Sequence, residues 1–170
     1  MEIRAAEESD FSTILSLITA NSEYLGIKPA VISVEQLIED CLKSSPPKFY
    51  CLVCVSDNRV VGYTIYNLTY CGRTGKAVNI QDFYLLDTHR ALGQDRLLKA
   101  VMKEAYEKGC CDLYTDVPIK EEDYKMFWLK RGALDDTDVV GYHVYQLNAE
   151  EFNSLTKTSS IKTIINEQEC

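Results

Sequence analysis

The segment His89–Asp95, which reads HRALGQD, has the residue types of a turn that holds phosphate. It follows an apolar, strand-like run and precedes a helical pattern, so the first N–H groups of that helix should lie beside the carboxyl end of the strand. Such N–H groups, together with the positive end of the helix dipole, bind anions. The segment therefore predicts a phosphate site, with Asp95 as its one unexpected member.

Two interpretations of Asp95 stay open. Its carboxylate, at about 4 Å from a phosphate oxygen, would cost roughly 1 kcal/mol if well solvated and about 4 kcal/mol at an effective dielectric near 20. Alternatively, Asp95 complements the helix dipole in the first turn, which contributes a few tenths of a kcal/mol to about 1 kcal/mol. Arg96 would offset part of the repulsion in the first case.

The chain has seven cysteines, and Cys51 and Cys54 form a CxxC pattern. Both lie in a strand-like run, and a strand places residues three apart on opposite faces, so the two thiolates cannot reach one metal ion. We expect free thiols in a reducing compartment and no metal site. The histidines, His89 and His143, are expected to be structural.

The positions of apolar residues predict the elements that must hold these groups. A short strand, EIRA, is expected at residues 2–5. Ser9 and Asp10 offer a cap for a helix whose apolar face includes Phe11 and Ile14. Ser33 and Gln36 fit a capping box for a second helix that ends before two prolines, Pro46 and Pro47.

Period-two runs then predict three antiparallel strands, over residues 49–55, 60–70 and 77–86, joined by turns at SDNR and CGRTGK. A long helix is expected from about Leu92 to Lys108, with Gly109 as its stop. A strand at 112–117, a helix at 121–131 and a last strand at 139–147 complete the pattern. The remaining segment, 148–170, is expected to be a polar tail.

This order predicts an α/β fold with a mixed, mostly antiparallel central sheet and helices on both faces, forming a single domain over residues 1–147. The chain has 170 residues and a formal net charge of −8. The negative charge disfavours nucleic acid and anionic membranes as partners. We expect a soluble, cytoplasmic protein, because no segment has the pattern of a signal peptide or a membrane span.

The run IQDFYLLDTHRALGQDRLLKAVMKEAYEKGC, the later FWLKRGA and the opening IRAAEESDFSTILSLI carry a resemblance to a known family. They resemble the GNAT superfamily of acetyl-CoA-dependent N-acetyltransferases, most of all its diamine (spermidine/spermine) and thialysine acetyltransferases. The match runs from about residue 3 to 147. It implies the GNAT fold, acetyl-CoA as cofactor and a homodimer.

The resemblance also implies a cofactor site. In the family, a loop of pattern Arg/Gln-x-x-Gly-x-Gly/Ala binds the coenzyme A pyrophosphate, and here Asp95 replaces its last small residue. A bulge in the preceding strand exposes backbone N–H groups to the thioester. An Asn that contacts the cofactor corresponds to Glu121, which would place another negative charge near the phosphate or the pantetheine. The implied cofactor residues are Phe83, Tyr84, Leu85, Arg90, Ala91, Leu92, Gly93, Gln94, Asp95 and Arg96.

Two catalytic positions of the family are substituted. The general base, a glutamate, corresponds to Gln81, whose amide cannot accept a proton at useful pH. Asp82 is retained, but it lies on the opposite strand face and cannot replace the base without a bulge. The general acid, a tyrosine, corresponds to Trp128, and an indole is no practical proton source. Tyr124 is the nearest phenol, but its spacing with Phe127 and Trp128 favours a packed helix face.

On the substrate side, the family's Tyr-Glu pair corresponds to Tyr24 and Leu25, and Asp82 is the third implied substrate residue. Two functions therefore remain open. The first is N-acetyl transfer to a small amine, weakened by the substitutions. The second is a catalytically inactive pseudo-acetyltransferase that binds a protein partner.

Overall fold

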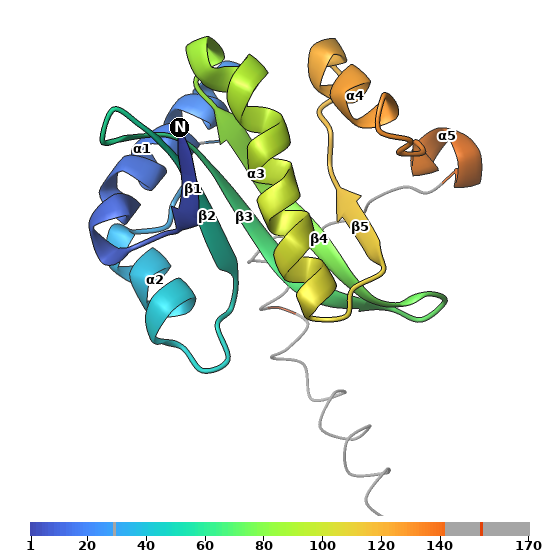
Figure 1. Ribbon diagram of the computed structural model, residues 1–170, viewed down its shortest axis with the longest axis horizontal. Coiled ribbons are helices and arrows are strands. Elements are labelled where there is room, and N and C mark those ends of the chain that lie inside the picture. The colour runs from blue at the N-terminus through green and yellow to red at the C-terminus, as the bar shows by residue number, and fades with distance from the viewer. Residues whose placement is uncertain (29, 142–153, 155–170) are drawn as a thin grey trace, which may run out of the picture. The chain divides into compact units, whose positions relative to one another are not determined.

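The computed structural model describes residues 1–28, 30–141 and 154 (Figure 1). By its internal contacts the chain divides into two compact units, one from Met1 to Glu121 and a second that begins at Glu122.

The first unit contains one five-stranded sheet in the order β1-β2-β3-β4-β5. The first three neighbouring pairs are antiparallel, and β5 pairs with β4 in parallel. This confirms the mixed, mostly antiparallel sheet expected from the sequence. The strands are β1 (Glu2–Ala5), β2 (Tyr50–Ser56), β3 (Arg59–Cys71), β4 (Gly75–Leu85) and β5 (Asp112–Thr115).

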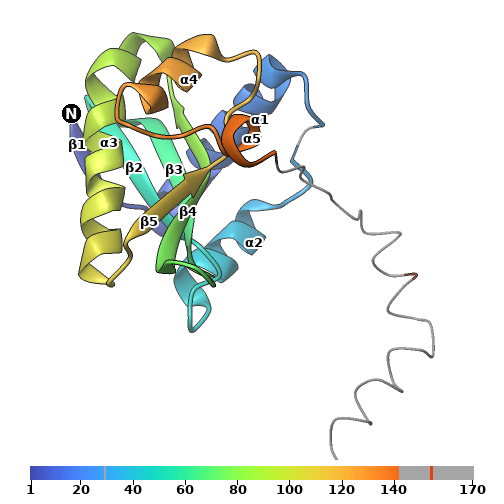
Figure 2. The same ribbon diagram turned by 90° about the vertical axis from the view of Figure 1, so that its right-hand side faces the viewer.

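Helices lie on both faces of this sheet, as expected (Figure 2). The long α3 (Asp87–Glu107) covers one face, where its Gly93 lies against Leu85 and Cys54. On the other face are α1 (Phe11–Leu25) and α2 (Val34–Ile38), which continues into a π-helical turn, η2 (Glu39–Lys43). Phe11, Ile14 and Leu17 of α1 pack there in one apolar cluster with α2 and the sheet.

The two cysteines of the CxxC pattern lie on opposite faces, as predicted. Cys51 belongs to the apolar cluster on the α1 face, whereas Cys54 lies beneath Gly93 of α3. Cys41, Cys51, Cys54, Cys71, Cys110 and Cys111 are all free thiols. Among the described residues, no three His, Cys, Asp or Glu side chains are grouped as they would be around a metal ion.

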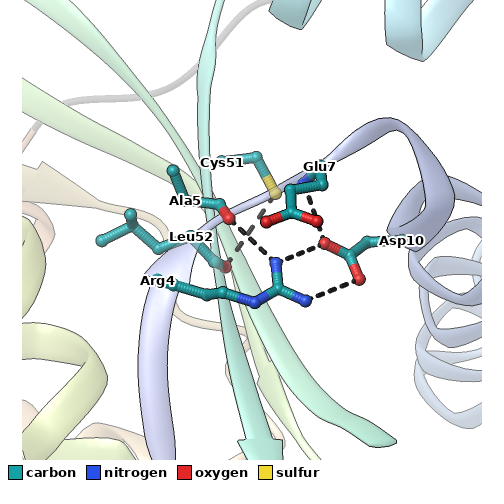
Figure 3. A network of polar contacts seen from close by, with 6 residues as sticks. All are labelled: Arg4, Ala5, Glu7, Asp10, Cys51 and Leu52. Atoms are coloured by element: carbon teal, nitrogen blue, oxygen red, sulfur yellow. Dashed lines mark hydrogen bonds and ion pairs between the residues drawn. The ribbon is translucent and has the colours of Figure 1, made fainter.

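The start of α1 differs from the prediction. Ser9 and Asp10 were expected to cap the helix, but Asp10 makes no side-chain cap bond and lies in a 3-10 turn, η1 (Glu8–Asp10). Its carboxylate instead accepts hydrogen bonds from Arg4, at 2.6 and 3.0 Å, and from the Glu7 N–H, at 2.8 Å (Figure 3). The charged guanidinium of β1 competes for the carboxylate and ties that strand to α1.

Other local predictions agree more closely. The Ser33 hydroxyl accepts a hydrogen bond from the Gln36 N–H at 3.2 Å, which confirms the second cap. The SDNR turn has positive φ at Asp57 and Asn58, as a tight hairpin requires. Gly109, with φ +81°, follows the end of α3.

In the second unit, α4 (Glu122–Leu129) confirms the predicted helix. The strand expected at 139–147 is wrong at its beginning, because Val139 and Val140 end a short helix, α5 (Asp136–Val140). Asp135 caps this helix by accepting a hydrogen bond from the Thr137 N–H, which outweighs the β-propensity of two valines. The rest of that strand, His143 and the tail 148–170 lie outside the described residues, except Ser154.

No helix in the described ranges is both long and apolar enough to cross a membrane.

Candidate active site

Strand β4 contains a bulge at Gln81. Ile80 pairs with Tyr66 and Asp82 pairs with Ile65, so Gln81 is an extra residue with no partner on β3. The parallel pairing with β5 ends at Ile80. Within the described part of the chain, the segment Gln81–Leu85 therefore has a paired strand on its β3 side only.

The bulge reverses the direction of Asp82. In a regular strand, residues two apart face the same side, so Asp82 would follow Ile80 toward α3. Tyr66, the partner of Ile80, faces α3, since its phenol donates to Glu104 of that helix. Ile65, the partner of Asp82, packs instead on the α1 cluster. The extra residue thus brings Asp82 to the α1 face.

Three elements meet at the Asp82 side chain. Its Oδ1 accepts a hydrogen bond from Asn21 of α1 at 3.3 Å, and its Oδ2 accepts one from the phenol of Tyr63 on β3. Burial raises the pKa of Asp82, and the hydrogen bonds oppose that rise. Tyr63 is fully buried, and burial beside this carboxylate raises its pKa as well.

The backbone of the bulge is fixed from β3. The Thr64 hydroxyl, which is fully buried, donates to the carbonyl of Asp82 at 2.9 Å. Phe83 and Leu85 bury their side chains in the core, so this segment can meet a ligand through its backbone edge. The side chain of Gln81, at the bulge itself, is exposed. The roles of Gln81, Phe83, Tyr84 and Leu85 stay predictions.

Helix α3 begins five residues earlier than predicted. It starts at Asp87 rather than Leu92, so the phosphate-binding turn expected at 89–95 is helical. Asp95 therefore lies in the third turn, and the interpretation that it complements the dipole in the first turn is wrong. Asp87 occupies that turn instead, and its carboxylate forms an ion pair with Arg90 at 2.7 Å.

Two other predicted cofactor residues have structural partners. Gly93 is buried, and a Cβ there would lie 2.2 Å from Leu85 Cδ2, so its missing side chain lets α3 approach the sheet. Arg96 donates to the carbonyl of Met1 at 2.8 Å, which ties α3 to the first strand. Ala91, Leu92 and Asp95 are exposed and Gln94 is half-buried, and their cofactor roles are untested.

The substrate-side residue Tyr24 is exposed at the end of α1. A hydrogen bond to the carboxylate of Glu121 is the largest cause of its raised pKa, and the charges of Arg90 and Asp87 also act on it. The structure thus brings Tyr24 together with Glu121 and the start of α3, while Leu25 supplies no charge. Nothing in the sequence signals this pairing, because the two residues are far apart along the chain.

Trp128 lies in α4 of the second unit. Its ring meets those of Tyr124 and Phe127 edge to face, at 6.0 and 5.2 Å between centroids. This confirms the packed helix face predicted from their spacing. A catalytic role for Trp128 stays a prediction.

The mixed five-stranded sheet with its bulged β4 agrees with the GNAT-like fold that the resemblance implies. A solved structure described as a probable acetyltransferase superposes with a TM-score of 0.70, at 17% identity, over 87% of this chain and 97% of that one. No family model matches the chain.

Two curated relatives confirm the resemblance in sequence. The chain is 30% identical over 161 residues to human (Homo sapiens) spermidine/spermine N(1)-acetyltransferase-like protein 1, covering 88% of this chain. It spans only 23% of that protein's length. It is 29% identical over 163 residues to the bovine (Bos taurus) thialysine N-epsilon-acetyltransferase, covering 90% of this chain and 95% of the relative.

Proposed function

We propose that the protein is an acetyl-CoA-dependent N-acetyltransferase that acts on a small amine, with weak affinity for its cofactor. The bulge at Gln81 carries this proposal, since it leaves the backbone edge of Gln81–Leu85 without a strand partner on the β5 side in the described residues. When bound, acetyl-CoA supplies a thioester: nitrogen bonds to the acetyl carbon, the carbon–sulfur bond breaks, and the thiol leaves with a proton from nitrogen.

The two ends of this site fit acetyl-CoA differently. The backbone of Phe83–Leu85 would hold the thioester end, as backbone N–H donors do for a developing oxyanion. The first turn of α3 would receive the pyrophosphate, but Asp87 already places a carboxylate there and engages Arg90. An anion approaching this turn meets a like charge, which costs roughly 1 kcal/mol at 4 Å when well solvated.

Side chains of the protein orient the groups that would meet the amine. Asn21 and Tyr63 hold the carboxylate of Asp82 in one orientation, and Thr64 fixes the bulge beside it. Holding an amine against a thioester supplies much of the rate of such a transfer, because it replaces an encounter of two molecules. The homodimer and the cytoplasmic location implied earlier are part of this proposal.

The test is acetyl transfer by purified protein at saturating acetyl-CoA, with products detected by mass spectrometry. The acceptor panel contains diamines, thialysine, arylalkylamines and peptides with free amino termini. Slow transfer to at least one amine is expected, and no transfer to any of them would contradict the proposal.

Two observations favour a second candidate. The ion pair of Asp87 with Arg90 and the amide of Gln81 both suit a protein that has lost catalysis and acts as a binding module. Such a pseudo-acetyltransferase would show no transfer at any acetyl-CoA concentration. Saturable acetyl-CoA binding at micromolar concentration would count against it.

A further inference from the structure

The carboxylate of Asp82 has only neutral donors around it. Asn21 donates to one oxygen at 3.3 Å, and the Tyr63 phenol donates to the other. Each carboxylate oxygen can accept more than one hydrogen bond, so acceptor capacity remains on both.

No cation compensates this charge among the described residues. None of the ion pairs found there includes Asp82, and the groups that lower its pKa are the Tyr63 phenol, the Asn21 amide and the Phe83 N–H. A half-buried carboxylate without a positive partner is costly to keep ionised. The site therefore suits a cationic ligand.

The position of Asp82 makes it relevant to amine chemistry. It is the residue directly after the bulge and two residues past the end of the β4–β5 pairing. It directly precedes the segment Phe83–Leu85, which is proposed to hold the thioester, and the bulge turns it to the α1 face, where Asn21 and Tyr63 hold it. Without the bulge it would face α3.

We propose that Asp82, and not Gln81, is the general base of this protein. Its carboxylate takes one proton from the ammonium form of the amine, which leaves a neutral amine with a free electron pair and a protonated Asp82. This inference rests on the proposed function. A carboxylate whose pKa is raised by burial is a better proton acceptor than an ordinary aspartate.

Two other titratable groups near Asp82, Tyr63 and Cys51, are buried. Burial raises the pKa of the Tyr63 phenol on β3 and of the Cys51 thiol on β2. Tyr84 lies beside Tyr63, with 6.2 Å between their ring centroids. From α1, the facing group is the Asn21 amide, which does not titrate.

The test is the pH dependence of kcat/KM for 1,4-diaminobutane in the wild type and in Asp82→Asn. In the wild type, kcat/KM should be level while Asp82 is ionised and the amine is protonated, and should fall at lower pH. In Asp82→Asn only neutral amine reacts, so kcat/KM at pH 7 should fall about 100-fold and then rise tenfold per pH unit. An unchanged profile would overturn the inference.

A second readout does not depend on turnover. Calorimetry of 1,4-diaminobutane should show binding at least tenfold weaker to Asp82→Asn than to the wild type. The control Glu107→Gln, which changes an exposed carboxylate at the far end of α3, should bind as the wild type does. Equal affinity in all three proteins would overturn the role of Asp82. If the wild type transfers no acetyl group although it binds the diamine more tightly than Asp82→Asn does, the proposed function would be overturned instead.

Tyr63→Phe covers the case in which Asp82→Asn does not fold. The phenol of Tyr63 lowers the pKa of Asp82, so removing its hydroxyl should raise that pKa. The decrease of kcat/KM at acidic pH should then begin at a higher pH, while any change of kcat/KM caused by deprotonation of the amine substrate should stay at the same pH. A profile identical to that of the wild type would contradict the proposal.

Discussion

Strand β4 after its bulge and the first turn of α3 are neighbours in the chain, yet they offer a ligand opposite conditions. The bulge presents a strand edge and a carboxylate with neutral donors only. The helix presents N–H groups in its first turn, but the carboxylate of Asp87 already lies at this positive end of the helix dipole and forms an ion pair with Arg90. Under the proposed function, the bulged strand would serve the chemistry on the amine, while the helix end that would meet the pyrophosphate already carries the carboxylate of Asp87.

The largest expected effect concerns Thr64 beneath the bulge. Thr64→Val keeps the shape of the side chain but leaves the carbonyl of Asp82 without its 2.9 Å hydrogen bond. Loss of a buried bond of this kind costs about 1–3 kcal/mol. Urea denaturation should show this loss, and acetyl transfer should fall with it. Full stability together with full activity would show that the bulge does not depend on Thr64.

A smaller effect is expected at Gly93, which the resemblance assigns to cofactor binding and the structure assigns to packing. Gly93→Ala places a Cβ 2.2 Å from the buried Leu85 side chain. Overpacking costs about 1–3 kcal/mol, and the better helix propensity of Ala returns up to about 1 kcal/mol. A net loss of stability is therefore expected.

The control for Gly93→Ala is Gly72→Ala, where a Cβ meets nothing within 4 Å. Its stability should stay within about 0.5 kcal/mol of the wild type. If Gly93→Ala instead weakened acetyl-CoA binding with no loss of stability, the packing role would be wrong.

The smallest effect is expected at the helix end. Asp87→Asn removes the like charge and releases Arg90, so acetyl-CoA should bind about fivefold more tightly, which corresponds to about 1 kcal/mol. The matched control, Asp95→Asn, lies two turns further along α3 and should change the affinity less. Equal effects at both positions, measured by calorimetry, would contradict the assignment of the pyrophosphate to the first turn.

Much of the fold could be predicted from the sequence because its signals are periodic. The apolar alternation of β2, β3 and β4 and the Ser33 cap both depend on residues close together in the chain. The start of α3 could not be predicted in the same way. Leu86 at its N-cap makes no side-chain cap bond, and Gly93 suggests a loop although tertiary packing keeps it helical.

The site was predicted less well, for a related reason. The sequence places Asp82 on the face opposite Gln81, and only the unequal pairing of β3 with β4 shows where the extra residue lies. The contacts of Asp82 with Asn21, and of Tyr24 with Glu121, join residues far apart in sequence. No local pattern encodes them.

The most direct test of the contrast between the two ends compares acetyl-CoA with S-acetylpantetheine, which carries the thioester but no pyrophosphate. Calorimetry on the wild-type protein should give affinities within about tenfold of each other, since the pyrophosphate gains little at a helix end matched by Asp87. Acetyl-CoA binding more than 100-fold tighter than the fragment, or no binding of either, would contradict the account.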